Sequence, residues 1–292
     1  MQELVGRVIE AKVTDSNDKY YFMQKAGVTF QMLKSEMDAE GKTLHIGGLI
    51  TGFAYENENH QMQMTRKLPK VQIGHYAWGE VVAQRRDLGV FVNIGLPNKD
   101  VVISLDTLPT IMALWPQKGD RVMLSLMVDN KGRLWGKLAD ESIFKAVTLK
   151  ARPALKNENI TATVFRLKMV GTFVLTDEYY MGFVHPDERD REPRLGEVVK
   201  ARVIGVRQDG LLNLSLKPRA YEAISQDAKM LLAMLEHNQT HTLPFTDKSD
   251  PKAIKEYFGI SKGQFKRAIG NLLKQRLVQQ SEGQLKLVNK EN

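Results

Sequence analysis

The chain has 292 residues, carries a formal net charge of +8 and contains no cysteine. A chain of this length suits two to four modules better than one small domain. The lack of cysteine excludes disulfides, thiolate zinc sites and cysteine nucleophiles, and it fits a reducing cytoplasm. No stretch approaches the roughly 20 apolar residues of a membrane span, and the first residues lack a signal-peptide pattern. We therefore expect a cytoplasmic protein that has no membrane partner.

The positive charge lies in the middle and at the end of the sequence. Lys and Arg minus Asp and Glu give −3 for residues 1–65 and +4 for residues 66–140. The same difference is +4 for residues 141–220 and +3 for residues 221–292. A polyanion would therefore meet the last three segments before the first. Because such a charge also keeps a protein soluble, charge alone favours nucleic acid only slightly.

Alternating apolar and polar residues predict three successive sets of short strands. Residues 1–65 contain five β-rich segments, and the short polar linker 66–70 follows them. Residues 71–138 repeat this order of five strands. A helical connector is predicted from Glu141 to Ala151, and five more strands follow from Ile160 to Lys217. Short strands with Gly and Asp at tight turns are typical of small OB-type barrels.

The second and third sets share short motifs at corresponding places. Gly89–Val92 and Gly171–Val174 both read Gly-X-Phe-Val on the second strand of their set. Gly119–Val122 and Gly196–Val199 both lead into the fourth strand, and an Asp/Gly hairpin precedes the fifth. Such internal similarity indicates repeated domains.

From residue 221 the apolar period changes from two to about 3.6, which predicts helices. The first helix is expected over residues 223–239. Asp250 before a proline predicts the start of a second helix that ends at Gly259. Ser261 and Gln264 form a capping-box pattern for a third helix, and two strands follow it. Three helices and a hairpin predict a winged helix-turn-helix.

These motifs resemble the S1 RNA-binding domain of ribosomal proteins and exoribonucleases. The order of three such units and a winged helix resembles the conserved virulence factor B family of bacterial RNA-binding regulators. The resemblance implies S1-like OB barrels at residues 1–65, 66–140 and 141–220, and a winged-helix domain at residues 221–292. We therefore expect a mainly β protein with three tandem five-stranded barrels and a C-terminal α+β module.

By the S1 pattern, the second unit places an aromatic ring, an aspartate and an arginine at Phe91, Asp129 and Arg133. The third unit matches the pattern's aromatic and histidine at Phe173 and His185. In the first unit the register of its aromatic residues stays open. The two phenylalanines are expected to stack on bases, although an aromatic on a small barrel can also pack inward. His185 is expected to contact a phosphate or a base edge, and the alternative is a structural role.

Further candidates come from cations that share a strand face with each other or with an aromatic ring. Arg133, Trp135 and Lys137 alternate on the last strand of the second unit. Arg166 with Lys168, and Lys200 with Arg202, form similar pairs in the third unit. The alternative for each set is a solvated or charge-protected strand face.

The last predicted helix has one apolar and one basic side. Its core stripe is expected to contain Phe265, Ala268, Ile269, Leu272 and Leu273. Its opposite side carries the cations of a recognition helix, which are Lys262, Lys266, Arg267 and Lys274. The alternative is a protein-interaction module with an ordinary lysine-rich surface.

Catalytic motifs are absent from the sequence. His237 and His241 lie four residues apart without the glutamate of a metalloprotease, and there is no P-loop or Gly-X-Ser-X-Gly motif. We therefore expect no enzyme, no cofactor and no metal site.

The expected function is binding of single-stranded RNA, with rings stacking on bases and Lys and Arg contacting phosphates. By resemblance, the role is post-transcriptional control of gene expression, including virulence genes. One alternative is a transcription regulator whose winged helix binds DNA. The other is an adaptor that contacts the ribosome or an RNA-processing nuclease.

Overall fold

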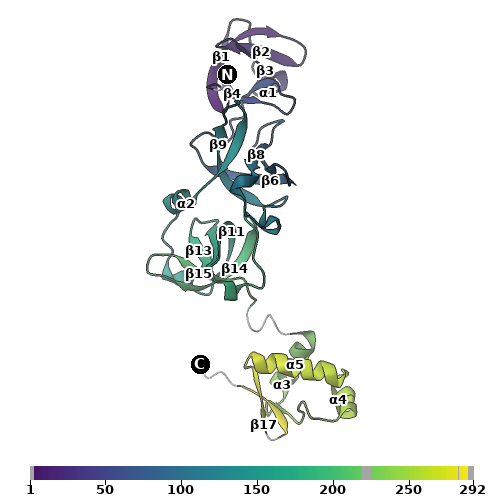
Figure 1. Cartoon of the computed structure of the whole chain (residues 1–292). Helices are drawn as coiled ribbons and strands as arrows, with labels where there is room; N and C mark the ends of the chain where they lie inside the picture. The colour runs from purple at the N-terminus through teal and green to yellow at the C-terminus, as the bar shows by residue number, and fades with distance from the viewer. Residues whose placement is uncertain (1–2, 219–224, 282, 289–292) are drawn as a thin grey trace. The chain divides into compact units, whose positions relative to one another are not determined.

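A computed structural model describes residues 3–218, 225–281 and 283–288. The chain divides into two compact units, Met1–Leu216 and Lys217–Asn292. Within the described residues, the first unit contains three closed five-stranded barrels, and the second contains three α-helices and a three-stranded sheet (Figure 1). The predicted fold class is confirmed. The predicted boundary between residues 220 and 221 lies outside the described residues.

The first barrel has the strand order β1-β2-β3-β5-β4. Its strands are β1 (Arg7–Ser16), β2 (Tyr20–Lys25), β3 (Val28–Leu33), β4 (Leu49–Glu56) and β5 (Met62–Thr65). A short helix, α1 (Lys34–Ala39), lies between β3 and β4, where no helix was predicted. Glu36 of this helix accepts hydrogen bonds from Thr65 Oγ1 at 2.8 Å and from the Arg66 backbone N–H at 2.7 Å. The tertiary contact with the end of β5 therefore fixes a segment too short for a helical period to be seen.

The second barrel repeats the topology with the order β10-β8-β7-β6-β9. Its strands are β6 (Ala77–Arg85), β7 (Gly89–Asn93), β8 (Val101–Ser104), β9 (Arg121–Val128) and β10 (Leu134–Leu138). Val90 and Val92 of β7 are buried in the core, so Phe91 between them faces outward. Gly89 has a φ of +136°, and an added Cβ would collide with the carbonyl oxygen of Ile103 on β8. The repeated glycine therefore permits close approach of the two strands.

The third barrel follows a connector and has the order β11-β12-β13-β15-β14. Its strands are β11 (Asn159–Lys168), β12 (Gly171–Thr176), β13 (Met181–Val184), β14 (Val198–Val206) and β15 (Leu212–Ser215). The connector helix α2 (Glu141–Val147) is shorter than predicted, because Thr148 is extended and the Leu149 N–H bonds to the Tyr179 carbonyl at 2.8 Å. Pairing with the third barrel thus ends the helix four residues early.

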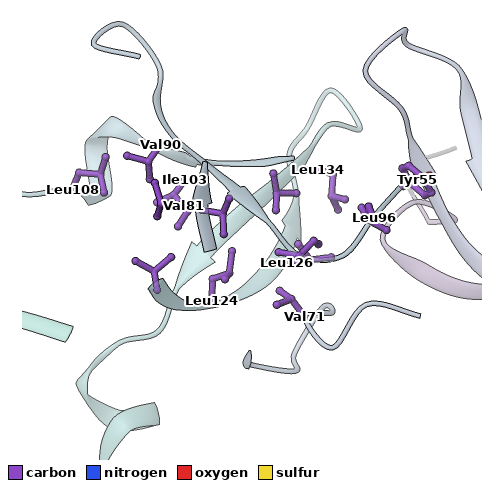
Figure 2. Packing of buried hydrophobic residues seen from close by; sticks show 14 of the residues in the cluster. Tyr55, Val71, Val81, Val90, Leu96, Ile103, Leu108, Leu124, Leu126 and Leu134 are labelled. Carbon is purple, nitrogen blue, oxygen red and sulfur yellow. The ribbon is translucent and has the colours of Figure 1, made fainter. Parts of the chain in front are cut away.

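The first two barrels share a hydrophobic core. Phe53 and Tyr55 of β4 belong to the same buried cluster as Leu96, Leu126 and Leu134 of the second barrel. Tyr55 and Leu96 lie next to each other in Figure 2. The linker predicted at residues 66–70 is also anchored. Its first residue is Arg66, and Nη1 of Arg66 donates to the Thr51 carbonyl at 2.6 Å. The linker is therefore packed against the first barrel.

Aromatic stacking and ion pairs join the second barrel to the third. Phe144 of α2 stacks on Phe165 of β11 with ring centroids 3.9 Å apart. Arg194 bonds to the buried carboxylate of Asp120 at 3.0 and 3.1 Å. Arg121 Nε donates to Thr163 Oγ1 at 2.7 Å. These contacts make the three barrels one packed unit.

The second unit has the predicted helices and hairpin together with one additional short strand. Its elements are α3 (Gln226–His237), β16 (Thr242–Leu243), α4 (Pro251–Phe258), α5 (Lys262–Lys274), β17 (Val278–Ser281) and β18 (Gln284–Leu287). The start predicted for the first helix lies outside the described residues, and α3 is capped by Ser225. Both hydrogen bonds of the Ser261–Gln264 capping box are present at α5.

One residue of the core stripe predicted on α5 is exposed in the structure. Phe265, Ala268, Ile269 and Leu272 are buried, but Leu273 is 37% exposed. The buried arc of α5 is narrower than predicted, because the helix packs mainly against α3 and contacts α4 and β17 less. No helix in the described part of the chain has the length and hydrophobicity to cross a membrane.

Candidate nucleic-acid interface

The outer face of the second barrel carries a row of apolar side chains across four strands. Phe91 of β7 lies opposite Val102 of β8, which lies opposite Trp135 of β10, and Met127 of β9 follows. Phe91, Val102 and Trp135 are partly exposed, and Met127 is 44% exposed. We call these four residues the outer row of the second barrel. With strands about 4.8 Å apart, the backbones at Phe91 and Trp135 are separated by roughly 10 Å.

Three of the predicted residues meet at one end of this row. Asp129 accepts from the Arg133 guanidinium at 2.7 Å and from Trp135 Nε1 at 3.1 Å. The guanidinium of Arg133 also lies 5.4 Å from the centre of the Trp135 ring. Hydrogen bonds from the Arg133 backbone N–H and the neighbouring donors hold the pKa of Asp129 well below its usual range. The ionised aspartate therefore fixes a cation beside an indole ring that remains partly exposed.

The third barrel carries a matching outer row, and one of its rings, Phe183, was not predicted from the sequence. Phe173 of β12 lies opposite Arg166 of β11 on one side and Phe183 of β13 on the other, and Asn213 of β15 follows. The Phe173 and Phe183 rings are 5.1 Å apart at 57°. Strand alternation could have predicted that Phe183 faces outward. Its neighbours Gly182 and Val184 are buried, so Phe183 between them lies on the outer face.

Lys168 covers the predicted ring in the third barrel. Its ammonium lies 5.1 Å from the centre of the Phe173 ring and 2.8 Å from a carboxylate oxygen of Glu141. Lys168, followed by Lys145, lowers the pKa of Glu141 to about 2. The carboxylate at the start of α2 thus holds a cation over the ring.

The corresponding row of the first barrel is closed. A bulge at the same place in β1, β6 and β11 aligns Phe22 with Phe91 and Phe173, which settles the register that the sequence left open. Gln31, Gln63 and Tyr55 follow Phe22 across the strands, and the last two are fully buried.

Asn98 of the second barrel closes this row. Its carbonyl oxygen accepts from the Tyr55 hydroxyl at 2.9 Å, and its amide donates to Gln63 at 2.9 Å. Burial raises the pKa of the Tyr55 hydroxyl well above its usual range. The first barrel therefore uses as a domain contact the surface that is open in the other two barrels.

Two of the remaining candidates lie away from the third row. Lys200 pairs across to Thr161 and Arg202 to Asn159. Thr161 is five residues from Arg166 along β11, or about 16 Å at about 3.3 Å per residue. These two cations therefore form a separate surface near the other end of β11.

His185 has a visible structural role. Its Nδ1 accepts from the Asp187 backbone N–H at 3.2 Å and caps a short 3-10 helix. Its side chain is also 57% exposed. The structure thus gives His185 a capping function, and nucleic-acid contact by its exposed side chain stays a prediction.

The winged-helix candidates all lie on α5, in the second unit. Lys266, Arg267 and Lys274 are exposed, and none of them forms an ion pair within the described residues. Lys262 is partly buried, and its ammonium lies 3.5 Å from the Lys248 carbonyl. The described residues contain no group of His, Cys, Asp and Glu side chains that could hold a metal ion.

Comparisons with known protein families match every domain of the chain. Residues 5–67 match the S1 domain, and residues 76–137 match the first S1-like domain of CvfB. Residues 144–218 match the second domain of the virulence regulatory factor CvfB, and residues 229–287 match the CvfB-like winged helix domain. The domains are thus of S1-like and winged-helix types.

Similar proteins cover nearly the whole chain. The conserved virulence factor B of Staphylococcus epidermidis is 35% identical over 290 residues, which cover 99% of this chain and 96% of that protein. The Bacillus subtilis protein YitL, described as uncharacterized, is 38% identical over 278 residues, or 95% of this chain and 92% of that protein.

A solved structure also matches along the full length. It is the crystal structure of a multidomain protein with nucleic acid binding domains from Streptococcus pneumoniae. The two are 43% identical with a TM-score of 0.71, and the match covers 98% of this chain and 99% of that chain. The domain matches and the full-length similarity agree, and the chain belongs to the conserved virulence factor B family.

Proposed function

We propose that the protein is a non-enzymatic regulator that binds single-stranded RNA along its second and third barrels. The observation that carries this proposal is the pair of open outer rows, in which partly exposed rings lie beside fixed cations. Stacking on an exposed ring contributes about 1–3 kcal/mol per base and tolerates any base, because every base has a flat face. Rows on two successive barrels of one packed unit suit an extended strand better than a duplex.

The distribution of charge supports the same proposal. Residues 1–65 carry a charge of −3, and their outer row is closed by Asn98. Residues 66–140 and 141–220 carry +4 each, and their outer rows are open. The acidic barrel is thus the one without an open row, as expected for a binding surface that selects a polyanion. A role in post-transcriptional control, including virulence genes, extends this proposal from the family.

A competition assay tests the choice of nucleic acid. A labelled oligouridine of about 16 nucleotides, at the upper end of one OB-fold site, is bound to the full chain and displaced by unlabelled single-stranded RNA or duplex DNA. The proposal predicts that single-stranded RNA competes at least tenfold better. Preferential displacement by duplex DNA would instead support the transcription-regulator alternative.

The exposed cations of α5 are proposed to contact RNA phosphates as well. Log affinity falls as log salt rises, and each phosphate contact on a single strand contributes about 0.7 to the steepness of this fall. Lys266→Ala combined with Arg267→Ala should therefore make the fall shallower by about 1.4. A matched control is Lys252→Ala with Lys255→Ala, which removes two exposed lysines from α4. If both double variants change the slope equally, α5 makes no specific contact.

A further inference from the structure

A cavity of about 410 Å³ lies between the second and third barrels. It is lined by the aromatic residues Trp78 of β6, Phe144 of α2 and Phe165 of β11. Lys137 of β10 and Arg166 of β11 also line it. Its volume falls within the range of about 300–1,000 Å³ typical of small-ligand pockets. An apolar aromatic interior with cations is the chemistry that receives a flat ring attached to a phosphate.

The two cations of this cavity are available to a ligand. Lys137 and Arg166 are exposed, and neither forms an ion pair with any residue that the structure describes. Asp140, the acidic residue of the lining, already accepts from the Ser142 and Ile143 backbone N–H groups at the start of α2. The carboxylate therefore serves mainly the helix cap, and its attraction to Lys137 is the weakest of the interactions that lower its pKa. The ammonium of Lys137 and the guanidinium of Arg166 can therefore still contact an anion.

The lining of the cavity also includes a neighbour of each open outer row. Lys137 is two residues from Trp135 on β10, so both side chains share the outer face of that strand. Arg166 lies directly opposite Phe173 in the pairing of β11 with β12. The lining thus contains one cation next to the row of the second barrel and one opposite Phe173 in the row of the third. These two cations relate the cavity to Trp135 in one row and to Phe173 in the other.

We propose that the cavity receives one unstacked base of an RNA strand that spans both barrels, with Lys137 and Arg166 contacting the phosphates on either side. This inference rests on the proposed function and adds a specific site to it. A base in the cavity couples the two rows into one continuous site. It also explains why the junction retains an open aromatic pocket where the contacts of Asp120 and Arg194 already hold the barrels together.

Filling the cavity tests the proposal. Thr107 is an exposed residue of the lining, so Thr107→Trp places an indole in the cavity without changing a core residue. Thr110→Trp is the matched control, because Thr110 is exposed and does not line the cavity. Thr107→Trp should weaken binding of an oligouridine of about 16 nucleotides by about tenfold, as expected for the loss of one base contact. Thr110→Trp should leave this affinity unchanged, and circular dichroism checks that both variants fold.

Oligonucleotide length and charge provide further readouts. An oligouridine of about 4 nucleotides, near the minimum for one OB fold, should bind Thr107→Trp and the unmodified chain equally. Lys137→Ala with Arg166→Ala should make the fall of log affinity with log salt shallower by about 1.4 for the long oligouridine. Removing two exposed lysines of the first barrel, through Lys12→Ala with Lys25→Ala, should not make this fall shallower.

The outcomes separate this inference from the proposed function. If the unmodified chain binds no RNA, the proposed function fails. If it binds RNA and folded Thr107→Trp binds the long oligouridine as tightly, the cavity inference is wrong and the proposed function stands. Saturable binding of free uridine monophosphate that does not compete with the long oligouridine would also overturn the inference, because the cavity would then serve a free nucleotide.

Discussion

Replacing one ring in each open row tests the stacking model most directly. Trp135→Leu and Phe173→Leu keep an apolar side chain at each position but remove the flat face that a base needs. Each change should weaken binding by about 1–3 kcal/mol, which is roughly 5- to 150-fold in Kd. Because the residues lie on different barrels, the two losses should add, giving about 2–6 kcal/mol for the double variant on a strand that contacts both.

The same changes should have a smaller effect on folding. Trp135 loses a hydrogen bond of 3.1 Å to Asp129 and the contact with Arg133, while Phe173 loses ring contacts with Phe165 and Phe183. Both side chains are only partly buried. We therefore expect each replacement to lower the free energy of unfolding by about 1–2 kcal/mol, against a total of about 5–15 kcal/mol for a typical protein.

The first barrel provides the matched control. Phe22→Leu changes the equivalent residue in the row that Asn98 closes, so RNA affinity should not change. Fluorescence anisotropy with a labelled oligouridine of about 16 nucleotides at several salt concentrations measures the three single variants and the double variant. The stacking variants should lose affinity while keeping the salt slope, because no phosphate contact is removed. A folded double variant that binds like the unmodified chain, or an equal loss for Phe22→Leu, would refute the stacking model.

Two further changes test the structural contacts around these rows. Asn98→Leu leaves the Tyr55 hydroxyl without its acceptor, whereas Gln63 Oε1 still accepts from Asn57 at 3.0 Å, so the free energy of unfolding should fall by about 1–3 kcal/mol; differential scanning calorimetry should show a lower Tm, and an unchanged Tm would contradict the contact. Glu141→Gln should lower the Tm most above pH 4.5, because the depressed pKa of Glu141 makes its ion pair with Lys168 stabilising there. This difference should disappear as the pH falls through about 2, and a difference that does not depend on pH would rule out the ion pair as its cause.

The sequence by itself determined most of the strands and helices, although it left α1 and β16 unpredicted and the facing of Phe91 open. Alternation places Phe91 between two buried valines, and the glycine before it is required because β7 approaches β8 closely. The capping box at Ser261 and the αL conformation of Gly259 follow from local hydrogen bonds and φ preferences, so short-range patterns were enough to predict them.

Only the tertiary structure decided which barrel surfaces remain open. The row of the first barrel is closed by Asn98, which is 43 residues away from Tyr55 in the chain. Phe183 joins the third row through strand pairing, and Lys137 and Arg166 line one cavity although they belong to different barrels. A local pattern determines the face on which a side chain lies, but what covers that face depends on packing between segments that are distant in the sequence.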